Sequence, residues 1–234
     1  MKKLGLIGGI GPESTLLYYR KLVYEVHRRV GGSFFPNLTI ESLNVFDVLT
    51  MCQNKDYDAL VSYLMVGIKN LVAAGAEVVA LTGNTPHIVF DELQEQATVP
   101  LISIIESTCD EARRLNKTKV GLLGTRFTME SDFFKKAFRD KSIAVVVPTQ
   151  NEIDFVAQTI AEELEHGIVK EETYARFSNI VERMKREQCI DAVVLGCTEL
   201  PLLFGQRQQS VDCLDTMEIH INALIAVMLG NHVP

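Results

Sequence analysis

Residues 3–8 read KLGLIG, and nearly the same pattern returns at residues 119–124 as KVGLLG. The two copies start 116 positions apart (119 − 3), and a Glu-Ser pair follows each of them, at residues 13–14 and 130–131. A short apolar run that ends in glycine predicts a buried strand followed by a tight turn. Two such units at this distance predict a chain made of two similar halves.

A second echo supports the same division. AEVVALT at residues 76–82 resembles DAVVLGC at residues 191–197, and this alignment pairs Thr82 with Cys197 at an offset of 115 (197 − 82). Because the two offsets are nearly equal, we predict duplicated α/β halves, with the ends of two equivalent strands facing each other across a cleft.

Apolar runs of about five residues recur along the chain, and amphipathic stretches separate them. Uninterrupted runs rich in β-branched residues are typical of strands buried on both faces in a parallel sheet, so we predict an α/β fold. The predicted strands are residues 4–7, 78–81, 100–104, 120–123, 144–147 and 192–195, and the predicted helices are residues 14–29, 57–74, 107–115, 130–139, 153–166, 171–187 and 217–229.

The domain limits follow from the repeat. We predict an N-terminal α/β domain of residues 1–116 that also receives a C-terminal helix at about 215–234, and a C-terminal α/β domain of residues 117–214.

The composition excludes several classes of protein. With 47% hydrophobic and 23% charged residues, the chain is typical of globular proteins, and its net charge of −7 is spread without a basic cluster, which predicts no nucleic-acid partner. Gly8 and Gly9 interrupt the first apolar run too early for a signal peptide, and we expect no membrane segment and a cytoplasmic location. Five cysteines without a CxxC pair predict free thiols and no metal site.

Polar turns follow three of the predicted strands, where ligands of parallel sheets gather. The glycine-rich turn at residues 8–15 can accept an anion, although it lacks the dinucleotide fingerprint and the lysine of a P-loop. In the other two turns, Asn84, Thr85 and Thr198 can bind a substrate carboxylate. The alternative is that these residues only cap helices.

Cys197 differs from the other cysteines, which we interpret as small buried apolar residues. It follows a predicted strand and precedes a predicted helix, where free N–H groups and the helix dipole favour the thiolate. We therefore predict a reactive thiol at Cys197. Of the five histidines, His87 follows the second polar turn and can orient a catalytic group.

These motifs resemble the aspartate/glutamate racemase family, in particular the branch of bacterial aspartate racemases and broad-specificity amino-acid racemases. The resemblance implies two similar three-layer α/β domains with mainly parallel sheets, related by a pseudo-twofold axis, and a homodimer that uses neither pyridoxal phosphate nor metal. The matching elements are residues 5–9 with 13–15, Gln53, residues 75–77, Asn84-Thr85 with His87, residues 123–125 with 128–129, residues 162–164 with Gly167, and residues 196–199.

In that family two cysteines, one from each half, act on opposite faces of the α-carbon. In the alignment given above, Thr82 stands where the first cysteine belongs, and a hydroxyl is a far weaker acid than a thiol. The resemblance implies that the Cys197 thiolate takes the α-proton of an L-amino acid, while Thr82, or a water that it positions, delivers a proton to the other face. Turnover from the L side should be favoured.

The resemblance also implies the substrate and its binding residues. L-Aspartate or L-glutamate is the expected substrate, although no arginine or lysine lies in the matching motifs. The α-carboxylate would bind Asn84, Thr85 and Thr198, and the remainder of the substrate would be surrounded by Ile10, Gln53, Gly83 and Glu162.

Two alternatives stay open. Relatives with a single cysteine can protonate a carbanion on one face, as in the decarboxylation of a disubstituted malonate. A non-catalytic amino-acid-binding protein is the other alternative, although a binding protein has no need of a thiol at a helix start. A nucleotide-dependent dehydrogenase is disfavoured because its fingerprint is missing.

Overall fold

The computed structural model describes residues 1–205, 207 and 209–230. The chain forms two compact units, Met1–Ile104 joined by the segment that starts at His220, and Ile105–Ile219. The predicted domain limits differ from these units, because they place residues 105–116 and about 215–219 in the first half. These limits remain a prediction. Residues 231–234 of the predicted C-terminal segment lie outside the described residues.

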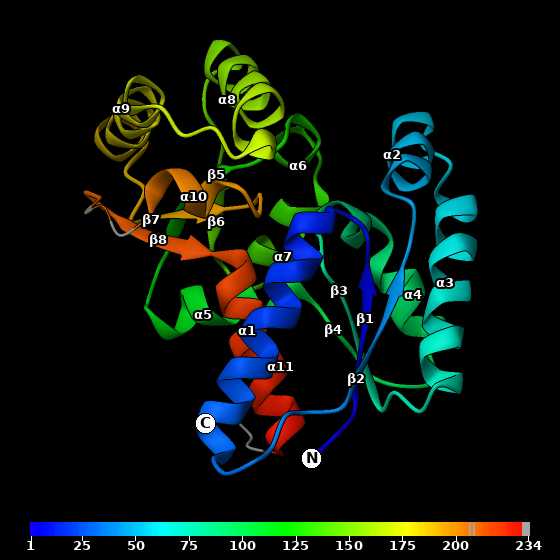
Figure 1. Ribbon diagram of the computed structural model, residues 1–234. Coiled ribbons are helices and arrows are strands. Elements are labelled where there is room, and N and C mark those ends of the chain that lie inside the picture. The colour runs from blue at the N-terminus through cyan, green and yellow to red at the C-terminus, as the bar shows by residue number, and fades with distance from the viewer. Residues whose placement is uncertain (206, 208, 231–234) are drawn as a thin grey trace. The chain divides into compact units, whose positions relative to one another are not determined.

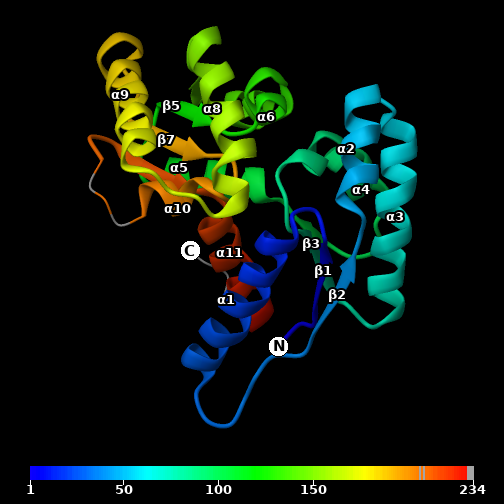
Figure 2. The ribbon, with the colours of Figure 1, turned by 45° about the horizontal axis from the view of Figure 1, so that its top comes forward.

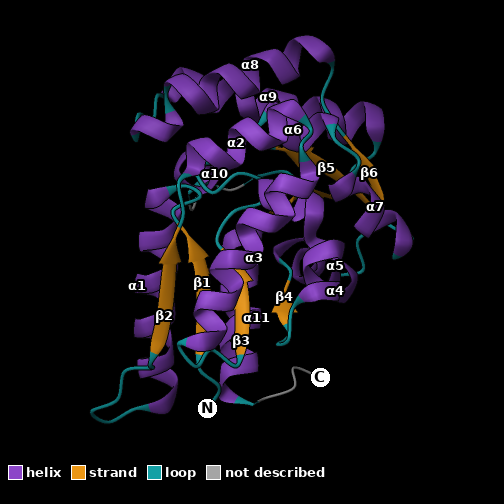
Figure 3. Ribbon diagram, turned by 90° about the vertical axis from the view of Figure 1, so that its right-hand side faces the viewer, coloured by secondary structure: helices purple, strands orange, loops and turns teal. Residues whose placement is uncertain are grey.

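The first unit contains a parallel sheet with the order β2-β1-β3-β4 (Figure 3). The two central strands, β1 (Leu4–Gly8) and β3 (Val78–Leu81), are buried along their whole length, as their apolar runs predict. The outer strands are β2 (Leu38–Ser42) and β4 (Leu101–Ile102).

Helices cover both faces of this sheet (Figure 1). One face carries α3 (Tyr57–Ala73), and the opposite face carries α1 (Pro12–Val30) and α11 (Thr216–Leu229), which begins in the second unit. Tyr18 of α1 and His220 of α11 join these two helices through a buried hydrogen bond of 2.8 Å. The remaining helices of the unit are α2 (Val45–Asn54), the 3₁₀ helix η1 (Thr85–Val89) and α4 (Phe90–Gln96).

The second unit repeats this topology with the order β6-β5-β7-β8, again parallel. Helices α8 (Gln150–Glu162) and α9 (Glu171–Gln188) lie on one face of the sheet (Figure 2). Apolar side chains of both helices share a buried cluster with side chains of β5 and β7. Its strands are β5 (Lys119–Leu123), β6 (Ala144–Val146), β7 (Ala192–Leu195) and β8 (Asp212–Asp215). Its helices are α5 (Ile104–Arg114), α6 (Arg126–Glu130), α7 (Phe133–Asp140), α8 (Gln150–Glu162), η2 (Leu164–His166), α9 (Glu171–Gln188) and α10 (Leu200–Phe204).

The glycine in the middle of each KLGLIG-type motif allows a helix end to approach the sheet. A Cβ atom at Gly5 would lie 2.9 Å from the Cβ of Ala76 and 3.1 Å from the Cβ of Leu71. At Gly121 it would lie 3.0 Å from the terminal carbon atoms of Met184 and Ile190. The motif is therefore repeated because each half packs a helix on its first strand in the same way.

The predicted α/β class is confirmed, and the differences from the predicted elements lie at the sheet edges. We predicted neither β2 nor β8, because these edge strands are only partly buried and lack a continuous apolar run. Residues 100–104 form only a two-residue strand before α5 begins, and the predicted helix 130–139 is divided between α6 and α7. Among the described residues, no helix has both the length and the apolar character to cross a membrane.

Candidate active site

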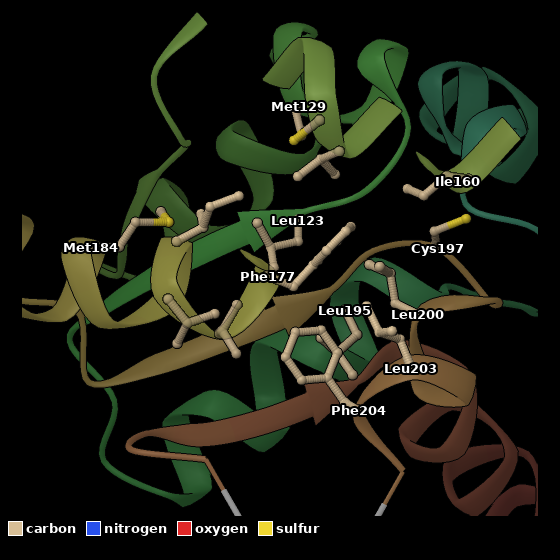
Figure 4. Close-up of a cluster of buried hydrophobic side chains, with 14 of the residues drawn as sticks. Leu123, Met129, Ile160, Phe177, Met184, Leu195, Cys197, Leu200, Leu203 and Phe204 are labelled. Carbon is tan, nitrogen blue, oxygen red and sulfur yellow. The ribbon is translucent and has the colours of Figure 1, made fainter. Parts of the chain in front are cut away.

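Cys197 lies just beyond the end of β7 in the second unit. Its side chain is 8% exposed and belongs to an apolar cluster that also contains Ile160 and Leu200 (Figure 4). Because β7 is buried on both faces and ends at Leu195, the chain leaves the sheet here while still inside the core. The thiol is therefore held in an apolar setting at the margin of the sheet.

Glu199 is the hydrogen-bond partner of this thiol. The Cys197 Sγ donates to Glu199 Oε2 at 2.9 Å, and the Thr198 hydroxyl donates to the same oxygen at 2.9 Å. One carboxylate oxygen thus orients both side chains and can accept the thiol proton. We assigned Glu199 no role from the sequence, although a thiol and a carboxylate two residues apart in a strand-end turn are a signal for such a pair.

The electrostatic setting of Cys197 differs from our prediction. Burial raises the pKa of the Cys197 thiol well above its usual range, and the negative charges of Glu199 and Glu165 raise it further. A backbone N–H at Glu199 lowers this pKa, as we expected of a helix start, but the effect is smaller. The predicted preference for thiolate is wrong, because α10 begins only at Leu200 and burial dominates.

Thr82 lies beyond the end of β3 in the first unit and is fully buried. Its hydroxyl donates to the carbonyl oxygen of Ile7 at 3.1 Å and lies 3.2 Å from the hydroxyl oxygen of Thr15. The Ser14 hydroxyl also contacts Thr82, through the main-chain carbonyl oxygen at 3.1 Å. These bonds fix the side chain of Thr82 against β1 and the first turn of α1.

The glycine-rich turn is shaped by positive φ angles at Gly9 (77°) and Gly11 (86°). Such angles favour glycine because a Cβ atom is strained there. The Gly9 amide donates to the Thr15 hydroxyl at 3.0 Å, and the Ser14 hydroxyl donates to the Gly11 carbonyl oxygen at 2.8 Å. The hydroxyls of α1 therefore hold the turn itself.

His87 supports the polar turn that follows Thr82. Since a carbonyl oxygen only accepts, Nδ1 of His87 must donate to the Gly83 carbonyl oxygen at 2.9 Å, and Nε2 accepts from the Ile104 amide at 3.2 Å. Burial lowers the pKa of His87 to about 4, so the ring is neutral at pH 7. This neutral imidazole connects the turn to the start of α5.

The register of the two sheets decides which residues of the halves correspond. Leu81 of β3 lies opposite Ile7 of β1, and Leu195 of β7 lies opposite Leu123 of β5. The first strands are related by an offset of 116 (123 − 7), whereas the third strands are related by 114 (195 − 81).

In the first unit the Thr82 amide donates to the Ile7 carbonyl oxygen at 3.0 Å, and in the second unit the Gly196 amide donates to the Leu123 carbonyl oxygen at 2.7 Å. Thr82 therefore corresponds to Gly196, and the counterpart of Cys197 is Gly83. The alignment of Thr82 with Cys197 that we predicted is wrong by one residue, because a short echo of apolar letters does not fix the last paired residue of a strand.

Comparison with known proteins decides the family. The family model described as Asp/Glu/Hydantoin racemase matches residues 7–224. The chain belongs to this family. A broad-specificity amino-acid racemase from Bacillus subtilis (strain 168) is 24% identical over 230 residues, which cover 97% of this chain and 98% of that protein.

Solved structures of similar proteins agree with the family assignment. An aspartate racemase homologue from Pyrococcus horikoshii OT3 has a TM-score of 0.84 and 38% identity, with 98% of this chain and 100% of that chain covered. The aspartate racemase from Picrophilus torridus shares the fold, with a TM-score of 0.74, 23% identity and coverage of 97% and 94%.

In this member of the racemase family, most predicted site residues lie in two turns. In the first unit, Ile10 is buried and approaches Gly83, where a Cβ atom would lie 3.0 Å from the Ile10 carbonyl oxygen. Asn84 and Thr85 follow in the same turn, and Asn84 is buried. Thr198 is half-buried beside Cys197 in the second unit.

Two predicted binding residues lie on helices outside these turns. Gln53 is exposed near the end of α2 in the first unit. Glu162 is exposed at the last position of α8, and both of its carboxylate oxygens accept from the Gln158 amide at 3.1 Å. Neither belongs to the turns that hold the thiol or the imidazole.

Proposed function

We propose that this chain racemises an amino acid without a cofactor, converting L-aspartate or L-glutamate to the D-form with a preference for the L-substrate. The observation that carries the proposal is the contact of 2.9 Å between Cys197 Sγ and Glu199 Oε2, in a chain that belongs to a racemase family. A buried thiol with a raised pKa needs a base, and this carboxylate can act as one.

The proposed reaction consists of two proton transfers at the α-carbon. Glu199 takes the proton of the Cys197 thiol, and the thiolate then takes the α-proton of the L-acid, so that an S–H bond forms as the C–H bond breaks. The carbanion receives a proton on its other face from Thr82 or from a water that Thr82 positions. Proton exchange with water then restores the starting protonation states.

The proposed substrate contacts follow the two turns. Asn84, Thr85 and Thr198 bind the α-carboxylate, with charge-assisted hydrogen bonds that contribute about 1.5–3 kcal/mol each. The neighbouring Cys197 is thereby placed near the α-carbon. The residues proposed around the remainder of the substrate are Ile10, Gln53, Gly83 and Glu162.

We propose further that the protein acts in the cytoplasm as a homodimer, with domains 1–116 plus about 215–234 and 117–214. The support for the dimer is the family resemblance. Light scattering after size exclusion tests the dimer, because a mass near 26.1 kDa would contradict it.

The test is α-proton exchange in deuterium oxide. L-Aspartate, L-glutamate and their D-enantiomers are followed by NMR with the wild-type protein and with Cys197→Ala, while chiral chromatography measures inversion. We expect exchange and inversion from an L-acid, and a loss of at least about 10³-fold in Cys197→Ala because no other thiol is hydrogen-bonded to a carboxylate in this turn.

Cys213→Ala is the matched control, since Cys213 is an exposed thiol on β8 of the same unit. It should exchange the α-proton at the wild-type rate. If none of the four acids exchanges, the acidic racemase proposal fails. The comparisons favour neither the decarboxylase nor the binding protein considered as alternatives.

A further inference from the structure

The position of Gly83 bears on the second proton transfer, since strand register makes it the counterpart of Cys197. A side-chain contact supports the same correspondence independently of the backbone bonds. A Cβ atom at Gly196 would lie 3.3 Å from the Thr128 methyl group, and Thr82 carries its side chain against Thr15 in the same way, with the two hydroxyl oxygens 3.2 Å apart. The Thr82 side chain is therefore directed into its unit, as a side chain at Gly196 would be in the other unit.

The hydroxyl of Thr82 is poorly placed to donate to a substrate. Its side chain is 0% exposed, and its proton is used in the bond of 3.1 Å to the Ile7 carbonyl oxygen. To reach any ligand, the side chain would have to leave both this acceptor and the Thr15 hydroxyl. Each lost bond at a buried site costs about 1–3 kcal/mol.

Gly83, in contrast, has a backbone that can carry a side chain. Its φ angle lies outside the left-handed region that favours glycine. A Cβ atom at Gly83 would point at the glycine-rich turn, 3.0 Å from the Ile10 carbonyl oxygen and 3.3 Å from the Ile10 Cγ2 atom, so Ile10 would have to move by a few tenths of an ångström to make room for it. A side chain here would extend beside a residue proposed to bind the substrate.

We propose that Gly83, and not Thr82, is the functional counterpart of Cys197, so that the first half supplies no acidic side chain and water delivers the second proton. The inference rests on the proposed racemase function and decides between its two proton sources. An O–H bond of water breaks as the C–H bond forms on the second face. The resulting hydroxide takes the proton that Glu199 received from the thiol, which restores the carboxylate and leaves the α-proton of the substrate on Cys197.

A one-thiol site has a measurable consequence. Once the Cys197 thiol has exchanged its proton for solvent deuterium, it deuterates the original face more often than water deuterates the other face, because water is a much weaker acid than a thiol. We expect the wild-type protein to exchange the α-proton of its L-substrate at least about tenfold faster than it inverts the α-carbon.

The first experiment compares the ratio of inversion to exchange in Gly83→Cys and Thr82→Cys. A thiol introduced at the correct position should raise this ratio at least about tenfold. We expect the rise in Gly83→Cys and none in Thr82→Cys. A rise in Thr82→Cys without one in Gly83→Cys would overturn the proposal, as would a wild-type ratio near one.

Thr82→Val provides a second activity test, because it keeps the shape of the side chain and removes the hydroxyl. We expect exchange and inversion to fall together, since the variant disturbs the contacts with β1 and α1 but removes no proton donor. A selective loss of inversion with normal exchange would identify Thr82 as the donor and overturn the proposal. Thr82→Ser, which keeps the hydroxyl, should restore both rates.

An alkylation experiment decides the correspondence without relying on activity. Folded Gly83→Cys and Thr82→Cys, each in the Cys197→Ala background, are treated with iodoacetamide, and labelled peptides are quantified by mass spectrometry. Both positions are buried, but a side chain at position 83 would point at the glycine-rich turn, whereas the one at position 82 is held against β1 and α1. We therefore expect the thiol introduced at position 83 to react at least about tenfold faster than the one at position 82. Equal or reversed rates would overturn the proposal, whereas absent exchange in the wild-type protein would count against the racemase function alone.

Discussion

The two halves end their third strands with the same backbone and with different chemistry. After β3 come Thr82 and Gly83, and after β7 come Gly196 and Cys197, with matching amide-to-carbonyl bonds in both units. The first half holds a buried hydroxyl, whereas the second holds a thiol bonded to a carboxylate. The comparison teaches that the duplicated sheets share one backbone arrangement, and that a single residue along the chain separates the buried Thr82 hydroxyl from the position that carries the thiol in the other half.

After Cys197→Ala, Glu199→Gln is expected to have the largest effect of the predicted changes. Replacing the carboxylate removes the base next to Cys197, so we expect kcat to fall about 10²-fold or more at neutral pH. Because the thiol pKa is raised by burial, part of the activity should return as the pH rises and the thiolate forms without help. Steady-state kinetics across the pH range measure both effects.

Glu165→Gln is the control, because Glu165 also raises the thiol pKa but is exposed and is not the carboxylate that accepts its proton. We expect a change of less than about fivefold. Equal losses in the two variants would mean that charge near the thiol matters and that Glu199 is not its base.

Acid stability should differ between the halves, because the first holds two buried histidines and the second holds only the exposed His166. Burial lowers the pKa of His87 to about 4 and that of His220 to about 3, and the charge of His87 further lowers the pKa of His220. The unfolded chain, with an ordinary histidine pKa of about 6.5, then binds more protons, so stability falls as the pH drops below about 6.5.

Between pH 7 and pH 5 we expect each buried histidine to cost about 2 kcal/mol of unfolding free energy. Urea denaturation at the two pH values measures this loss. His87→Asn, which keeps a donor for the Gly83 carbonyl oxygen, should remove about half of the pH dependence. His166→Gln should leave it unchanged, and an equal slope in all three proteins would contradict the assignment.

Replacement by alanine should lower the stability of the fold to different extents at Gly5 and Gly121, the central glycines of the two motifs. Gly5→Ala places a methyl group against the Cβ atoms of Leu71 and Ala76, which are fixed to the backbone, so we expect a loss of about 2 kcal/mol. Gly121→Ala meets only the flexible ends of Met184 and Ile190, and we expect a loss below about 1 kcal/mol. Chemical denaturation measures both, and a larger loss for Gly121→Ala would reverse the comparison.

The smallest predicted effect concerns the residues that follow α3 and α9. Gly75 and Cys189 both adopt positive φ angles, 87° and 56°, at an offset of 114 (189 − 75). We expect Gly75→Ala to destabilise the fold by about 1 kcal/mol and Cys189→Gly to stabilise it by somewhat less, because only the cysteine is strained there. Thermal unfolding measures these shifts, and a destabilised Cys189→Gly would show that its thiol packs favourably.

Much of the fold could be predicted from the sequence. The KLGLIG repeat and the short apolar runs indicate a duplicated α/β fold, because central parallel strands are buried on both faces. Cys197 could be singled out because a strand-end turn is where such sheets place their chemistry. The edge strands β2 and β8 could not be found, since partial burial leaves no continuous apolar pattern.

The sequence by itself determined the family, the strand-end turns and the candidate thiol, because these depend on local pattern and residue type. Tertiary structure alone decided three further points: that the Cys197 thiol donates a hydrogen bond to Glu199, that burial raises the pKa of this thiol, and that Gly83 corresponds to Cys197 in strand register. Each of these points depends on strand register or on desolvation. Spacing along the sequence leaves the register uncertain by one residue, and a shift of one residue turns an inward side chain outward.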